Sequence, residues 1–233
     1  MSASGGPAAP PSYRAIYETL LAHCAEVTKW RHESPFEIAV GAILVQNTTW
    51  GNVERSLAAL RDAEAIAPGA LARMPARELE ALIRPSGFMT AKAATLRTIA
   101  RWWIDAEVDE LPAERDAPAP GPVRGAHALA DADLRADLLA LRGIGPETAD
   151  VLSLYVFERR AFIWDAYGRR LLGALGYPVT GAYESTRRRL GPGFPLEEFT
   201  VRELQDFHSL ILMAGKDARR HGGWERCAPV VGF

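Results

Sequence analysis

The sequence predicts an all-α fold, and three observations support that prediction. Apolar residues recur at helical spacing in nearly every segment, the alternation typical of strands is scarce, and stretches rich in proline and glycine separate the helical segments. The chain has 233 residues, of which 48% are hydrophobic. It is therefore long enough to bury a sizeable core as one large domain or two small ones.

The helical segments follow one another along the chain. Residues 13–24 come first, with Ile16, Leu20 and Leu21 on one side of the expected helix. Residues 36–45, FEIAVGAILV, are apolar almost all round, so we expect this helix to be buried at the centre of its domain. Further helices are expected over residues 53–60, 76–83, 90–103, 134–141, 146–157, 167–175 and 201–220.

Two segments are expected to lie outside the helices. The first twelve residues, MSASGGPAAPPS, lack the basic start and apolar core of a signal peptide, which predicts a disordered tail over residues 1–12. Residues 105–130 are rich in proline, glycine and alanine, which predicts a surface excursion.

No apolar run approaches the ~20 residues that a membrane span needs. We therefore expect no membrane partner and a cytoplasmic location.

Charge and cysteine content exclude several classes of protein. The formal net charge is −2 and the pI about 6.2, so no global field attracts nucleic acid, and the basic run at residues 187–189 is interpreted as a solvated face. The two cysteines, Cys24 and Cys227, are too few for a disulfide framework or a four-cysteine iron–sulfur cluster. The histidines show no metal-ligand spacing. We expect no metal and no cofactor.

The most informative segment is residues 141–150, LRGIGPETAD. A Gly-x-Gly turn that opens into a helix leaves backbone N–H groups unpaired at the positive end of the helix dipole, which suits a phosphate. Gly143 and Gly145 are expected to supply permissive backbone angles and a close approach, while Ile144 points into the core. Pro146 fits the first helical position.

A single aspartate, Asp165 in FIWDAYGRR, precedes the next helix. Asp is a preferred N-cap residue, so capping is the simplest role for this carboxylate. A capping carboxylate at a cleft can also face a substrate. The two roles are compatible.

The order of hairpin, helix and isolated aspartate resembles the endonuclease III superfamily of helix-hairpin-helix DNA glycosylases, over roughly residues 30–222. The resemblance implies that the hairpin grips the DNA backbone and that Asp165 faces a flipped nucleotide. It also implies a six-helix domain over residues 35–148, a second domain from residues 13–34 and 149–233, and an active-site cleft between them. The implied DNA contacts in the hairpin are Arg142, Gly143, Ile144, Gly145 and Thr148.

Two further places match the family. Gln46 in AILVQNTTW matches the polar residue that enters the gap left by the flipped nucleotide, and Phe88 in RPSGFMTAKA matches the apolar residue that wedges into the opposite strand. Each has a structural alternative: Gln46 as a helix C-terminal cap and Phe88 as a core anchor. Because both matches occur in the same chain, the DNA contact and the structural role have equal weight for Phe88.

The departures from the family pattern are equally informative. Bifunctional members carry a lysine at the position of Glu147 and use it to form a Schiff base, which a glutamate cannot do. The glutamate, the missing four-cysteine cluster and the strings VQNT, RPSGF and ARRHG together resemble the branch of 3-methyladenine DNA glycosylase III. An N3-methylated adenine is cationic, so aromatic rings can select it by cation–π contact. Trp30 and Trp50 are candidates for that pocket, with core packing as the alternative, and Glu147 is a candidate negative partner.

These patterns predict a monofunctional DNA glycosylase of base excision repair that releases alkylated purines, 3-methyladenine first, without cutting the strand. Asp165 would be its catalytic carboxylate. The expected partner is double-stranded DNA containing a damaged base, bound by a monomer that associates with the bacterial nucleoid when it acts. Two alternatives stay open: a thymine or uracil mismatch glycosylase, and a catalytically silent DNA-binding protein that uses only the hairpin.

Overall fold

The computed structural model describes residues 9–24, 27, 34–108 and 125–226, and within these ranges the chain is helical without a strand. None of the helices in this described part is both long and apolar enough to cross a membrane. The helices are α1 (Tyr13–Ala22), α2 (Pro35–Leu44), α3 (Trp50–Asp62), α4 (Pro68–Arg73), α5 (Ala76–Leu82), α6 (Met89–Asp105), α7 (Asp131–Ala140), α8 (Pro146–Tyr155), α9 (Ala166–Ala174), α10 (Tyr183–Leu190) and α11 (Val201–Arg220).

The chain divides into two compact units. The hairpin unit spans residues 31–159 and contains α2 to α8, and the terminal unit combines residues 1–30 with 160–233 and contains α1 and α9 to α11. Short 3₁₀ helices join these elements, among them η1 (Arg84–Ser86) and η2 (Gly125–Ala128) in the hairpin unit. Each unit has a core of its own.

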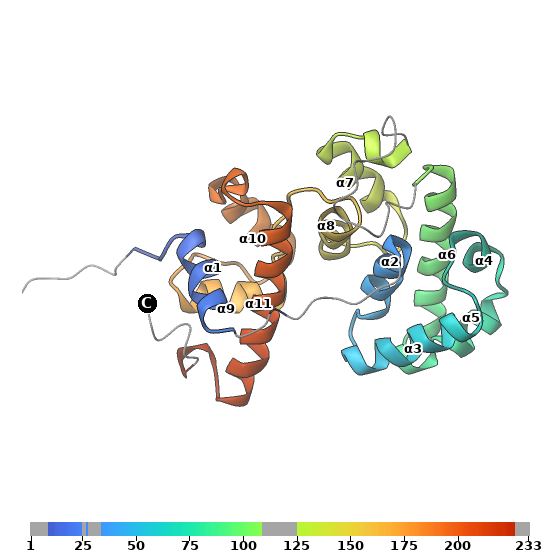
Figure 1. The fold of residues 1–233 in the computed structure, drawn as a ribbon, viewed down its shortest axis with the longest axis horizontal. Coiled ribbons are helices and arrows are strands. Elements are labelled where there is room, and N and C mark those ends of the chain that lie inside the picture. Colours follow the sequence, from blue (N-terminus) through green and yellow to red (C-terminus); the bar gives the residue numbers. More distant parts are fainter. Residues whose placement is uncertain (1–8, 25–26, 28–33, 109–124, 227–233) are drawn as a thin grey trace, which may run out of the picture. The chain divides into compact units, whose positions relative to one another are not determined.

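The centre of the hairpin unit is α2, as the sequence predicts. Ser34 caps the helix by accepting a hydrogen bond from the Glu37 backbone N–H at 3.2 Å, Pro35 occupies the first turn, and every residue from 36 to 44 is buried. The helix packs against α3, α6 and α8, and Figure 1 shows it between α6 and α8. A helix that is apolar on all sides can be accommodated only where neighbours cover every face.

The boundary between the units differs from the expected one. We expected the second domain to resume at residue 149, but α8 packs on α2 and α7 and belongs to the hairpin unit, so the division falls after Arg159. A buried ion pair fixes this arrangement, because Arg135 Nε on α7 lies 2.7 Å from Asp150 Oδ1 on α8. Of the expected excursion at residues 105–130, the last residue of α6, η2 and their flanks are described, and residues 109–124 lie outside the described part.

The core of the terminal unit is aromatic. Tyr13 on α1 packs against Phe162 and Phe194, with ring centroids 6.3 and 4.6 Å apart, and Tyr17 lies 5.5 Å from Phe207 on α11. Such contacts add to the burial of the rings themselves. They join α1 to the segment that leads into α9, and so hold that segment in place.

Candidate functional site

The hairpin turn between α7 and α8 depends on Gly143. This residue has a φ of +92°, and a Cβ atom added there would lie 2.0 Å from Thr95 Oγ1 on α6. Both the positive φ and the lack of space require glycine. The turn therefore rests directly on α6, and its shape is set by that contact.

Gly145 is different, because the expectation that it supplies permissive backbone angles was wrong. Its φ of −93° and ψ of 175° are extended angles that any residue adopts, so the backbone needs no glycine there. A Cβ atom at Gly145 would have no neighbour within 4 Å, which leaves the outer side of the turn open. The preceding residue, Ile144, is 5% exposed and packs into the core, whereas Arg142 is exposed.

The first turn of α8 joins the hairpin to the segment after α2. Gln46 Nε2 donates a hydrogen bond to Thr148 Oγ1 at 3.0 Å, and Thr148 is buried. Gln46 is therefore not the C-cap of α2, because the helix ends at Leu44 and Val45 is its C-cap. Glu147 lies in the same first turn and is exposed. Of the residues named from the sequence, Gln46, Glu147 and Thr148 are thus brought together.

Phe88 is an exposed residue and not a core anchor. Its side chain is 67% exposed, and its φ of +50° follows a φ of +68° at Gly87. A bulky residue in the left-handed region is strained, and strain of this kind gathers at functional sites. The structure therefore holds an aromatic ring in solvent at an energetic cost, directly before α6.

The structure describes one of the two candidate tryptophans, Trp50. Trp50 opens α3, is half-buried, and donates a hydrogen bond from Nε1 to Glu54 Oε1 at 3.0 Å. Half-burial is compatible with both roles named for it, the base pocket and core packing. Trp30 lies outside the described residues.

A buried lysine was missed in the sequence analysis. Lys92 on α6 is 5% exposed, and its Nζ donates to the Leu44 carbonyl at 2.8 Å and the Ser86 carbonyl at 2.7 Å. The signal was present in the sequence, because Lys92 shares helical spacing with the apolar Leu96 and Ile99. A lysine on the apolar face of a helix requires hydrogen-bond partners inside the core.

Asp165 belongs to the terminal unit and caps α9. Its Oδ1 accepts a hydrogen bond from the Gly168 backbone N–H at 2.6 Å, and the residue is 5% exposed. Burial raises the pKa of its carboxyl to about 6, although the Gly168 N–H and the Arg169 guanidinium favour the ionised form. Near neutral pH the group is a carboxylate that is costly to keep charged, which is typical of functional carboxylates.

The helix that Asp165 caps is held close to α11. The Tyr167 ring lies against Gly215, where an added Cβ atom would come within 2.2 Å of the ring. Arg169 Nη1 also donates to the Trp164 carbonyl at 2.6 Å, which closes the turn around the aspartate. These contacts hold the N-terminus of α9, and with it the Gly168 N–H that binds the carboxylate.

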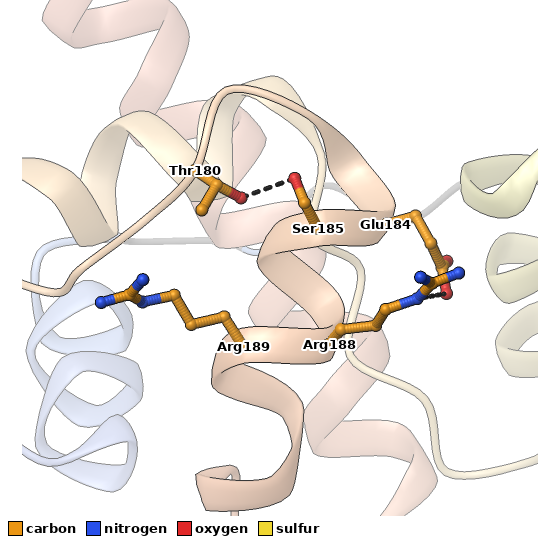
Figure 2. Close-up of a pocket in the computed structure, with 5 residues that line it drawn as sticks. All are labelled: Thr180, Glu184, Ser185, Arg188 and Arg189. Carbon is orange, nitrogen blue, oxygen red and sulfur yellow. Dashed lines mark hydrogen bonds and ion pairs between the residues drawn. The ribbon is translucent and has the colours of Figure 1, made fainter.

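A separate surface hollow lies on α10, and none of the residues predicted for the site lines it. Thr180, Glu184, Ser185, Arg188 and Arg189 line it. Figure 2 shows Arg188 beside Glu184 and Arg189 extending from the other side of the helix, and Glu184 also pairs with Arg187 at 3.5 Å. Two of the three arginines in the basic run thus share one exposed-face carboxylate, which agrees with a solvated face.

Sequence comparison assigns the family. Residues 40–196 match the HhH-GPD superfamily of base excision DNA repair proteins. A candidate DNA repair glycosylase from Methanocaldococcus jannaschii is 34% identical over 203 residues, which cover 84% of each chain. The chain belongs to the HhH-GPD superfamily of base excision DNA repair proteins. It is a DNA glycosylase, as its resemblance to the endonuclease III superfamily implied.

Solved structures share the fold. The H. pylori 3-methyladenine DNA glycosylase bound to 1,N6-ethenoadenine is 24% identical with a TM-score of 0.62, and the match covers 87% of this chain and 97% of that one. A trapped covalent complex of endonuclease III with DNA has a TM-score of 0.68 at 19% identity, covering 94% and 95% of the two chains. The predicted all-α helix-hairpin-helix glycosylase fold is confirmed.

Proposed function

We propose that this protein is a monofunctional glycosylase that hydrolyses the N-glycosidic bond of alkylated purines in duplex DNA, with 3-methyladenine as the leading substrate. The observation that carries the proposal is a pair of carboxylates: Glu147 in the hairpin helix, where bifunctional relatives use an amine, and the buried Asp165. Together they favour attack by water over attack by a lysine.

DNA binding is assigned to the hairpin. The open outer side of Gly145 and the backbone N–H groups at the start of α8 suit a phosphate oxygen, and the exposed Arg142 adds a positive charge beside them. These contacts carry no sequence information, so they hold any duplex equally. Gln46 and the exposed Phe88 would fill the space that the flipped nucleotide leaves.

Asp165 is assigned the chemical step. Cleavage of an N-glycosidic bond places positive charge on the sugar, and a carboxylate held rigidly in a poorly solvated place stabilises that charge strongly. The same carboxylate can orient or deprotonate the attacking water. The Gly168 N–H holds the carboxylate in place through Oδ1.

A covalent route through a lysine of the hairpin unit is disfavoured, because the sequence of residues 31–159 contains one lysine, Lys92. Lys92 is buried and donates to two backbone carbonyls, so it has no access to a sugar carbon. Glu147 cannot form a Schiff base. Strand cleavage by β-elimination is therefore not expected.

Selection of the base is assigned to aromatic and negative groups. A cationic purine is attracted to electron-rich rings, worth ~0.5–2 kcal/mol for each contact. Trp50 is half-buried and follows Gln46 by four residues, Trp30 is the second candidate, and Glu147 offers a negative charge. The solved H. pylori glycosylase of similar fold is named for 3-methyladenine, which supports the same substrate class here.

An iron–sulfur cluster of the endonuclease III type does not fit this chain. Such clusters need four thiolate ligands, and the whole sequence contains two cysteines. We therefore propose that the protein works without a cofactor, and the purified protein should contain no iron.

The test is single-turnover base release from duplexes that contain 3-methyladenine, 7-methylguanine, 1,N6-ethenoadenine, a G·T mismatch or a G·U mismatch. Release of alkylated purines, with strand breaks only after alkali, supports the proposal. Release confined to the mismatched pyrimidines would favour the mismatch glycosylase. Tight binding of every duplex without release of any base would favour the silent DNA-binding protein.

A further inference from the structure

The Lys92 ammonium joins two helix ends. Leu44 is the last residue of α2 and Ser86 is the last residue of η1, and Lys92 Nζ donates to the carbonyls of both. Terminal carbonyls have no partner within their own helix, and the C-terminal end of a helix carries partial negative charge. One buried cation therefore satisfies both ends at once.

Burying the Lys92 ammonium costs more free energy than burying an apolar side chain of similar size. The partners of Lys92 in the described part of the chain are carbonyl dipoles and no carboxylate, and burial lowers the pKa of the ammonium below its usual range. A methionine would fill a similar volume without the cost of burying a charge. The lysine supplies what a methionine cannot, namely a directional tie between two separate backbone segments.

The two tied segments are those that lead to the residues assigned to enter the duplex. Gln46 follows Leu44 by two residues, and Phe88 follows Ser86 by two residues. Each segment has further anchors, among them the Gln46 hydrogen bond to Thr148 and the Ser86 contact with Ser56, where the two hydroxyl oxygens lie 2.8 Å apart. Asn52 also bonds near both, to Thr48 Oγ1 at 2.8 Å and from Ser86 Oγ at 3.5 Å, but it is Lys92 whose one nitrogen binds the backbone carbonyls of both segments.

We infer that Lys92 is a positioning residue that fixes the spacing between the Gln46 and Phe88 segments, so that both side chains enter the duplex as one rigid device. This inference rests on the proposed function, because it assumes that both residues take part in flipping. Lys92 itself touches neither DNA nor the reacting atoms. Its contribution is the geometry of the other two residues.

The test is a set of double-mutant cycles on single-turnover excision of 3-methyladenine, with 2-aminopurine fluorescence beside the lesion as a direct measure of flipping. Lys92→Met should slow excision by about 10-fold to 100-fold, because a displacement of about 1 Å at positioning groups has effects of that size. Flipping should fall in parallel. Affinity for undamaged duplex should stay within about twofold, because phosphate contacts lie elsewhere.

The cycles separate positioning from a general loss of stability. In the Lys92→Met background, Phe88→Ala and Gln46→Ala should each cost much less than in the parent, because the two side chains are already misplaced. The exposed Lys216→Met on α11 is the matched control for loss of one positive charge, and its cycles should be additive. Additive costs for Lys92→Met with both partners would overturn the inference.

Two further outcomes are distinguishable. If Phe88→Ala and Gln46→Ala leave excision unchanged in the parent, the assumption from the proposed function fails before Lys92 is tested. If Lys92→Met does not fold by circular dichroism, Lys92→Gln replaces it, because the amide keeps an N–H donor while losing the charge. The same non-additivity is then expected, and additivity again contradicts the inference.

Discussion

The hairpin turn and the Asp165 turn are both helix N-termini, yet they are built in opposite ways. The hairpin is set by backbone shape, with a required glycine at 143 against α6 and an open outer side at 145. The Asp165 turn is closed, and it buries a carboxylate whose pKa is raised to about 6. Steric fit governs the first and the protonation state of one group governs the second.

This difference indicates how the two tasks are divided. A grip on the DNA backbone needs exposed N–H groups and no ionisable side chain, so it should not change with pH near neutrality. Cleavage of a glycosidic bond needs a charge in a poorly solvated place, and that charge is costly to maintain. Changes at the hairpin should therefore alter affinity, and changes at Asp165 should alter rate.

The largest expected effect is the complete absence of a covalent adduct between the protein and DNA. Borohydride trapping on DNA with an abasic site should give no covalent adduct, because the hairpin helix offers Glu147 in place of an amine. The measurement is gel mobility of labelled DNA, with Glu147→Lys as a variant that restores an amine at the position. A strong adduct from the parent, mapped to a residue of either turn, would refute the monofunctional assignment.

The second-largest effect is a difference in pH dependence between excision, which uses Asp165, and DNA binding, which uses the hairpin. Asp165 must be ionised to act, so excision at subsaturating protein should fall about tenfold per pH unit below about 6 and level off above 7. Affinity for undamaged duplex should stay level over the same range. A midpoint near 4, the ordinary range of an aspartic acid, would mean that the burial of Asp165 does not persist in solution.

The two hairpin glycines should behave differently when replaced. Gly143→Ala places a Cβ against Thr95 at a positive φ, and we expect it to lower the free energy of unfolding by about 1–3 kcal/mol. Gly145→Ala should leave stability nearly unchanged, since the backbone is extended and the space is open. Urea denaturation of both variants measures this, and equal losses would show that the contact on α6 is not decisive.

The smallest expected effect concerns stability at Asp165. Its folded pKa is raised above the unfolded value, so stability from this group is present at low pH and is lost as the pH rises through about 6. Asp165→Asn keeps the capping oxygen without the charge, and should raise the free energy of unfolding by about 1–2 kcal/mol at pH 8. The gain should vanish at pH 4. A loss of stability at pH 8 would show that the charge itself holds the turn.

Much of the fold could be predicted because its signals are local. The all-round apolar pattern of α2 predicted a central helix, and Ile144 and Pro146 occupy the positions that their residue types suggest. By contrast α10, YESTRRRL, was missed because it has little apolar surface for periodicity to reveal. The short α4 was missed as well, since a helix of six residues gives too brief a pattern.

The site was predictable in residue identity more than in conformation. The sequence indicated Phe88 but not its exposure, which depends on two successive residues with positive φ. It indicated both glycines of the hairpin but not that only Gly143 requires one, because that depends on Thr95, distant in sequence. The unit boundary moved for the same reason, since α8 is held by the ion pair between Arg135 and Asp150.

The most direct test of the division of tasks compares Asp165→Asn with Gly145→Leu on one duplex that contains 3-methyladenine, measuring affinity and single-turnover excision for both. The aspartate variant should bind like the parent and excise about 10²-fold to 10³-fold more slowly. The glycine variant should fold normally, bind more weakly to every sequence with a shallower salt dependence, and excise at the parental rate once saturated. Excision by Asp165→Asn at close to the parental rate would contradict the account.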